Sequence, residues 1–128
     1  MWRHTALLFA RESADLCCEL AKDQPYVYLS DLAMSLYTLA GCLFKQRDPK
    51  SMLSALRVVR RAVKSCAWLF VHVSTNVAGE FERAKGRFQA IADECGLQSY
   101  HELQQVLAEF DNADPSELLS ELCKPLEP

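Results

Sequence analysis

The sequence has little glycine, little proline and little of the alternation that marks a half-buried strand. Its 128 residues include four glycines and five prolines, and β-branched residues rarely alternate with polar ones. A chain of this length forms one domain that buries about two-thirds of its unfolded surface, so it needs neither a metal nor a disulfide to fold. These features predict a single all-α domain over residues 1–128.

The chain also lacks a strong excess of charge of one sign. Its formal net charge is -3, and acidic and basic residues are mixed along the sequence. Such a mixture gives no field that would hold a polyanion such as DNA, RNA or an acidic membrane surface. We therefore expect no nucleic-acid partner.

The cysteines lack the spacing of a zinc site and the density of a secreted disulfide scaffold. The six are Cys17, Cys18, Cys42, Cys66, Cys95 and Cys123. The neighbours Cys17 and Cys18 point about 100° apart on a helix, so their adjacency makes neither a chelate nor a ready disulfide. We expect reduced, mostly buried cysteines, no bound metal and a cytoplasmic setting.

Catalytic motifs are missing as well. The sequence contains no H-E-x-x-H, no G-x-x-x-x-G-K and no G-x-S-x-G. His72, inside "WLFVHV", could act as an acid or base or pair with Cys66 as a ligand, but a hydrogen-bonded core histidine is the commoner case. We expect a protein that is not an enzyme and that holds no cofactor.

One apolar run approaches the length of a membrane span. It extends from Tyr26 to Phe44 and carries one formal charge, Asp31. Ser30, Ser35 and Thr38 interrupt it, no basic cluster flanks its start, and a centrally packed helix is also apolar all round. We expect a packed helix and no membrane span.

Prolines and cap residues predict about six helices. The first should run from about Trp2 to Lys22 and stop before Pro25, because a residue before proline is pushed out of the α region. The second should begin between Pro25 and Asp31, with Ser30 as a candidate cap, and end near Lys45.

The later helix limits follow from the same signals. Asp48 and Pro49 supply a cap and a first-turn proline for the third helix, and "VSTN", Val73 to Asn76, supplies the break before the fourth. Gly96 suits the end of the fourth helix. The segments "SYHE", Ser99 to Glu102, and "DPSE", Asp114 to Glu117, should begin the fifth and sixth, and the tail after Lys124 should fray.

An internal repeat relates the first two helices to the next two. A shift of 45 positions aligns apolar residues of both pairs, as a stacked array of helix hairpins would require. The alternative is a coincidence, since amphipathic helices often match at some register. The aligned pairs include Leu7 with Met52, Leu8 with Leu53, Ala10 with Ala55, Leu32 with Val77, Ala33 with Ala78 and Leu36 with Phe81.

The spacing of these residues resembles the tetratricopeptide repeat. Each such repeat is a hairpin of two helices, called A and B, and small residues let the two approach closely. The residues that carry it are Leu36, Leu39, Ala40, Leu43, Ala55, Val59 and Ala62. The segment "ARESADLCCELAKDQPYVYLSDLAMSLYTLAGCL" is similar to longer-period repeats near those of kinesin light chain, found in arrays attached to microbial and fungal signalling ATPases. The resemblance implies repeat helices over about 1–72, with a degenerate repeat and capping helices over 73–128.

The resemblance also implies a partner and a binding face. In this family the concave face of helix A binds another protein or a peptide, and the matching positions are Met34, Tyr37, Gly41, Phe44 and Lys45. The alternative is that Tyr37 and Phe44 pack on a neighbouring helix, because aromatic residues at helical spacing are usually core.

A basic stripe on the third helix has acidic equivalents on the first. The two sets are expected to pair across the outer face rather than form an anion site. The cations are Arg57, Arg60, Arg61 and Lys64, and the acids are Glu12, Asp15 and Glu19.

The first helix reads as a helix B that has no helix A before it. Its apolar residues Trp2, Leu7, Leu8 and Phe9 would then lie where that partner is missing. The cover could be a second copy, a different protein, or the C-terminal helices around Leu118, Leu119 and Leu122. We favour self-association or another partner over fold-back, because exposed apolar strips usually mark interfaces.

These observations predict a non-catalytic, cytoplasmic protein-interaction module or adaptor of tetratricopeptide-like type. The alternative is a small helical bundle that binds an apolar ligand or forms an obligate oligomer, with the repeat register a coincidence.

Overall fold

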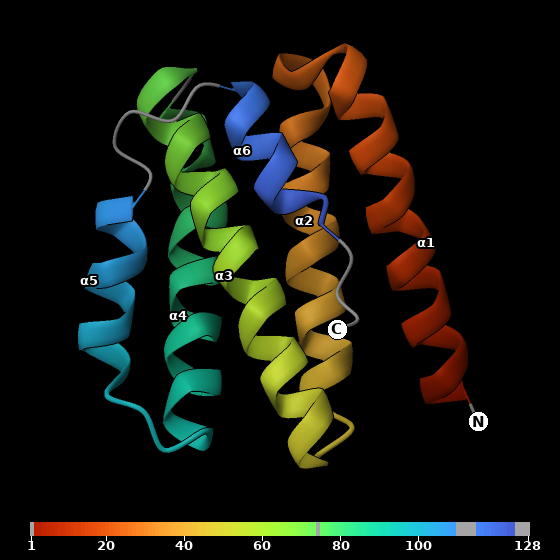
Figure 1. The fold of residues 1–128 in the computed structure, drawn as a ribbon, viewed down its shortest axis with the longest axis vertical. Coiled ribbons are helices and arrows are strands. Elements are labelled where there is room, and N and C mark those ends of the chain that lie inside the picture. The colour runs from red at the N-terminus through yellow and green to blue at the C-terminus, as the bar shows by residue number, and fades with distance from the viewer. Residues whose placement is uncertain (1, 74, 110–114, 125–128) are drawn as a thin grey trace.

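The described residues form six α-helices, one short 3-10 helix and no strand (Figure 1). A computed structural model describes the backbone of residues 2–73, 75–109 and 115–124, and the side chains of 5–73, 76–109 and 117–124. The all-α prediction is confirmed. The elements are α1 (Trp2–Asp23), α2 (Pro25–Phe44), α3 (Pro49–His72), η1 (Thr75–Val77), α4 (Ala78–Glu94), α5 (Ser99–Glu109) and α6 (Pro115–Leu122).

Local cap chemistry sets the start of α3. The carboxylate of Asp48 accepts a hydrogen bond from the backbone amide of Ser51 at 2.9 Å, and Pro49 occupies the first turn. The same amide holds the pKa of Asp48 below its ordinary value. This start agrees with the sequence prediction.

The start of α2 differs from the predicted cap. Pro25 itself opens the helix, so Ser30 lies inside α2 and caps nothing. A proline is suited to this position because its missing amide donor is not needed in the first turn and its φ is already helical.

The end of α4 is closed by Gly96, as predicted. Its φ of +77° lets the chain reverse without the clash that a Cβ would cause. The amide of Leu97 then donates to the carbonyl of Ala92, and the amide of Gly96 to that of Asp93, both at 3.0 Å. The predicted break after α3 also occurs, at η1, whereas Asp114 and the tail beyond Lys124 lie outside the described residues.

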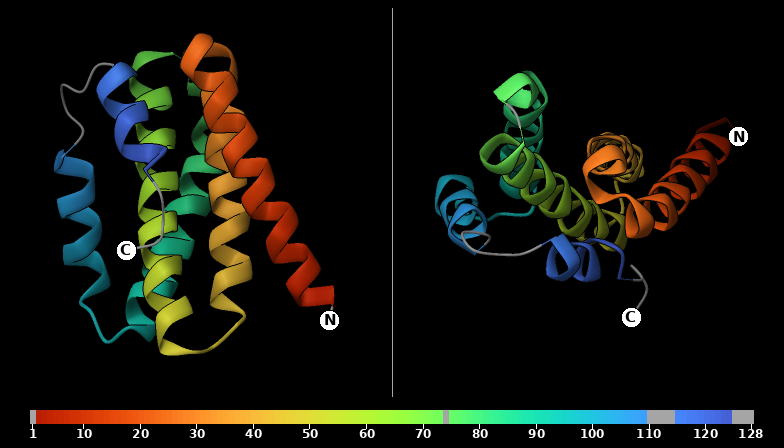
Figure 2. Two further views of the ribbon diagram at one scale, coloured as in Figure 1. Left: turned by 45° about the vertical axis from the view of Figure 1, so that its right-hand side comes forward. Right: turned by 90° about the horizontal axis from the view of Figure 1, so that it is seen from above.

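Consecutive helices from α1 to α5 run antiparallel and pack on one another in chain order (Figure 1). The sixth leaves this order: α6 packs against α1 and α3, and seen from above it lies on the side of α3 away from α4 (Figure 2). In the same views α1 and α2 diverge, and the gap between their ribbons is widest at the N-terminal end of α1.

The core is centred on α3. It packs against α2, α4, α5 and α6, and every residue from 62 to 69 is buried, including Trp68. The neighbouring α2 is long and apolar enough to cross a membrane by length and composition, and here its leucines pack into the core. A helix with neighbours on several sides is expected to be apolar all round.

Charged side chains tie the C-terminal helices to α3. The ammonium of Lys64, whose side chain is 5% exposed, lies 2.8 Å from a carboxylate oxygen of Glu109 on α5 and also pairs with Glu121 on α6. Arg60 adds a bond to Glu109 at 3.0 Å. Arg61 donates to two backbone carbonyls at the end of α6.

The predicted pairing of this basic stripe with acids of α1 is therefore wrong for Arg60, Arg61 and Lys64. The reason is topological, because α6 packs against both α1 and α3 and occupies the place where the two would meet. Glu19 pairs instead with Lys22 on its own helix.

We predict that Ala62→Leu lowers the free energy of unfolding by about 1–3 kcal/mol, because Ala62 is fully buried and the added methyl groups must displace packed neighbours. Ala55→Leu should behave alike. The control Ala90→Leu, at an exposed position of α4, should change stability by less than about 0.5 kcal/mol. Urea unfolding measures all three, and a neutral Ala62→Leu would show that the helices do not approach closely here.

We also predict a pH-dependent contribution from Glu109. Its pKa is lower in the folded state, chiefly because Lys64 donates a hydrogen bond to its carboxylate. The stabilisation is present above the ordinary pKa of 4.5 and is lost as the pH falls through the lower folded value. The difference in unfolding free energy between wild type and Glu109→Gln should therefore shrink on acidification, and should be smaller in a Lys64→Met background. If the difference in unfolding free energy between wild type and Glu109→Gln does not change with pH, the predicted contribution of Glu109 is wrong.

Candidate functional site

The residues predicted for a concave binding face do lie along α2, but they meet different neighbours. Tyr37 faces α4, where the guanidinium of Arg87 lies 3.9 Å from the centre of its ring. The same guanidinium donates a hydrogen bond to the backbone carbonyl of Tyr37 at 3.0 Å. This cation–π contact and hydrogen bond join α2 to α4.

Gly41 provides the space for this contact. A Cβ at Gly41 would lie 2.5 Å from the Nη1 atom of Arg87, too close for both to remain. Gly41 is buried, so the guanidinium occupies the surface of α2 that a side chain would otherwise cover. At this level the space between α2 and α4 is filled by Arg87, which agrees with packing of Tyr37 on a neighbouring helix.

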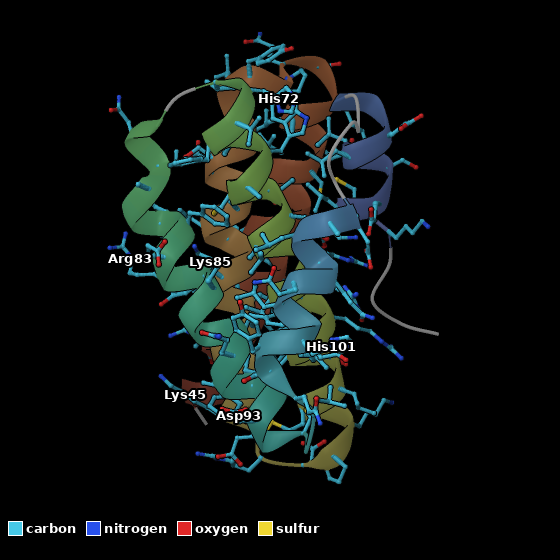
Figure 3. All side chains as sticks on the ribbon, turned by 90° about the vertical axis from the view of Figure 1, so that its left-hand side faces the viewer. Lys45, His72, Arg83, Lys85, Asp93 and His101 are labelled. Atoms are coloured by element: carbon cyan, nitrogen blue, oxygen red, sulfur yellow. The ribbon has the colours of Figure 1, made fainter. Side chains whose placement is uncertain are left out.

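Of the other three predicted residues, Met34 and Phe44 lie elsewhere on α2, and Lys45 directly follows its end. Met34 lines a cavity of about 160 Å³ between α1 and α2, beside a contact of 3.0 Å between the hydroxyls of Ser13 and Ser35. Phe44 is half-buried, with the guanidinium of Arg47 4.8 Å from its ring, and Lys45 is exposed. Figure 3 shows Lys45 at the end of the molecule opposite His72.

The N-terminal half of α1 keeps an exposed apolar surface. Leu7 is half-buried against the core, whereas Leu8 is 47% and Phe9 67% exposed. The side chain of Trp2 lies outside the described residues. Another chain is the expected cover of this helix, yet α6, with Leu118 and its neighbours, does fold back onto α1.

Two further leucines of α1, which the sequence pattern did not single out, are exposed. Leu16 is 60% and Leu20 38% exposed. Leu16 lies seven residues after Phe9 and Leu20 four residues after Leu16, which places all three side chains on one face of the helix. We call Phe9, Leu16 and Leu20 the α1 stripe. The helical period could have revealed this stripe, but it could not have shown that this face of α1 stays exposed in the fold.

Beside the middle of α1, a cavity of about 310 Å³ opens among α1, α2, α3 and the end of α6. Its lining combines two cysteines with charged side chains. They include Arg11, Asp15, Cys18, Arg61, Cys123 and Lys124. In the described part of the chain, no group of three or more metal-ligating side chains comes together.

The cysteines are less buried than predicted. All six are unpaired, but only Cys66 is fully buried, and the others lie at half-buried positions on the helix faces. Burial raises the pKa of the Cys66 thiol to about 12. The prediction failed because helix periodicity identifies an apolar face without showing how completely neighbours cover its edges.

His72 is not a core residue, contrary to the prediction. It lies exposed at the end of α3, where its ring stacks on Trp68 with the ring centres 4.6 Å apart. Its Nδ1 atom is 3.1 Å from the carbonyl oxygen of Trp68.

Comparison of the chain with protein-family models, with curated proteins and with solved structures finds no match. The resemblance to tetratricopeptide repeats therefore rests on the residues of this chain alone.

We predict that Gly41 and Arg87 are energetically coupled. In an Arg87→Ala background, Gly41→Ala should stabilise the fold by about 1 kcal/mol, because alanine favours a helix over glycine. In the wild type the new methyl group displaces the guanidinium, so the gain should be smaller by at least about 0.5 kcal/mol.

The matched control is Gly86→Ala on α4, where an added Cβ meets no neighbouring atom within 4 Å. It should stabilise by about 0.5–1 kcal/mol in either background. Urea unfolding of the four variants of the cycle measures the coupling, and additive effects of Gly41→Ala and Arg87→Ala would contradict this contact.

Proposed function

We propose that this chain is a non-catalytic protein-interaction module of tetratricopeptide-like type, and that it binds its partner through the α1 stripe. The observation that carries the proposal is the exposure of Phe9, Leu16 and Leu20 along one face of a helix that leans out of the bundle (Figure 2). A continuous apolar strip on a helix surface commonly marks a site of protein contact.

Neighbouring side chains on α2 extend this surface. Val27 and Met34 are also exposed, and the contact between Ser13 and Ser35 sets α1 and α2 side by side in antiparallel register. A partner helix laid along α1 would reach both helices. The surface therefore fits an amphipathic helix better than an extended peptide.

The charges around the stripe indicate the chemistry of the partner. Glu12, Glu19 and Asp23 are exposed, and each lies three residues after a member of the stripe, so all three border it. An apolar partner helix flanked by Lys or Arg would complement this rim. A second copy of the chain would bring acidic residues toward acidic residues, which makes a different protein the better fit.

One observation favours the alternative, a bundle that binds an apolar ligand. A cavity of about 530 Å³ lies where the turn before α3 meets the end of α4, lined by Pro49, Met52, Leu53 and Cys95. Arg47 and Glu94, whose charged groups lie 3.8 Å apart, close one side of it. Its charged side makes it less suited to a fully apolar ligand than to a small amphipathic one.

The setting that we propose is the cytoplasm, with no membrane span and no bound cofactor. The support is the set of six unpaired cysteines, which suits a reducing compartment.

The test compares Leu16→Glu/Leu20→Glu with Leu53→Glu, a matched control at an exposed position of α3. Immobilised wild-type chain and both variants are incubated with cell extract, and retained proteins are identified by mass spectrometry. We expect the wild type and Leu53→Glu to retain the same protein and the stripe variant to lose it by at least about tenfold, with all melting temperatures within a few degrees.

Retention of the same proteins by all three chains would contradict the proposed surface. Sedimentation of the wild type at micromolar concentration completes the test. A dimer that becomes a monomer in the stripe variant would identify a second copy as the partner, in place of a different protein. A thermal shift with apolar or amphipathic small molecules that is lost in Leu53→Glu would instead support the alternative.

A further inference from the structure

Two half-buried thiols from opposite ends of the sequence meet where α6 returns to α1. Cys18 lies on α1, and Cys123 directly follows Leu122, the last residue of α6. Both line the cavity of about 310 Å³ described above. Hydrogen bonding between the two thiols is the largest influence on the pKa of each, which agrees with their place side by side in the lining of this cavity.

The backbone around Cys123 is held on both sides. The Nη1 atom of Arg61 donates to the carbonyl of Leu122 at 3.3 Å and to that of Lys124 at 2.7 Å. The amide of Cys123 donates to the carbonyl of Leu119 at 2.9 Å. These bonds, with the burial of Leu122, keep the Cys123 side chain beside α1. The approach of the two thiols is therefore built into the packing of α6.

The charges around the pair give the two thiols different reactivity. The hydrogen bond from Cys18, with the positive charges of Lys22 and Arg61, lowers the pKa of Cys123 against the opposing effects of burial and Glu19. The same hydrogen bond, burial and Asp15 raise the pKa of Cys18. Cys123 is thus the sulfur that more readily becomes a thiolate, and thiolates are the reactive form of cysteine.

The remaining cysteines offer no comparable pair. Cys66 is buried in the core of α3, and its thiol pKa is raised by burial. The pKa of Cys95 is also raised, by burial and by Glu94. Cys17 lies 3.5 Å from the hydroxyl of Ser35.

We propose that Cys18 and Cys123 form a redox site in which hydrogen peroxide produces a reversible disulfide between α1 and the end of α6. The Cys123 thiolate attacks one peroxide oxygen, the O–O bond breaks, and the leaving hydroxide takes a proton to become water. Cys18 then attacks the sulfur of the resulting sulfenic acid, the S–O bond breaks, and a second water leaves. Two thiols are oxidised to one disulfide, and one peroxide is reduced to two waters.

The disulfide would enclose most of the chain in one covalent loop. In the reduced protein the contacts that hold α6 include packing, the Lys64 ion pair with Glu121 and the Arg61 hydrogen bonds. The oxidised protein adds a bond that unfolding cannot break, which limits the freedom of the unfolded chain. This inference does not depend on which surface binds a partner.

The test treats the full chain with a stoichiometric amount of hydrogen peroxide, then alkylates free thiols under denaturing conditions and measures the intact mass. We expect the wild-type monomer to lose two of its six alkylatable thiols, and dithiothreitol to restore them. Proteolysis should yield one peptide pair joined through Cys18 and Cys123. The oxidised chain should melt higher by roughly 5 °C or more.

Three variants complete the test. The control Cys95→Ser should still lose two thiols, whereas Cys18→Ser and Cys123→Ser should form no intramolecular disulfide and show no rise in melting temperature. The joined peptide is sought in the wild type, so the result does not depend on the folding of any variant. Disulfides that join other cysteines, or equal thiol loss in Cys18→Ser, would overturn the proposal.

Discussion

The ion pairs of Lys64 are the interaction on which the arrangement of the C-terminal half depends. This lysine lies on α3, the helix with the most neighbours, and its side chain is almost completely buried. A charge removed from water costs several kcal/mol unless partners neutralise it. Those partners, Glu109 and Glu121, come from α5 and α6, so the neutralisation of Lys64 and the docking of both helices are one event.

The docking of α6 decides which surfaces remain available. With α5 and α6 docked, Arg60, Arg61 and Lys64 of α3 are paired within the fold. Helix α6 brings Cys123 to Cys18 and packs on one side of α1. It leaves the α1 stripe exposed along the whole face from Phe9 through Leu16 to Leu20. The proposed binding surface and the proposed redox site therefore have the same structural origin.

Features set by neighbours in sequence could be predicted, and features set by distant contacts could not. The cap at Asp48 and the reversal at Gly96 depend on a few adjacent residues, and both occur as expected. The binding face implied by the family resemblance likewise grouped Tyr37 and Gly41, which lie four residues apart on α2. It did not reveal that Arg87, from α4, fills the space beside them. A pattern shows which face of a helix is apolar, but the tertiary fold decides what covers it.

Hydrogen exchange followed by mass spectrometry tests this account most directly. The backbone amides of residues 118–122 on α6 should be protected in the wild-type chain, because α6 is docked through Glu121 on Lys64. In Lys64→Ala that protection should fall by at least about tenfold, while amides of α2 remain protected. Rapid exchange of α6 in the wild type, or equal protection of α6 in both chains, would contradict the claim that Lys64 holds the C-terminal helices on α3.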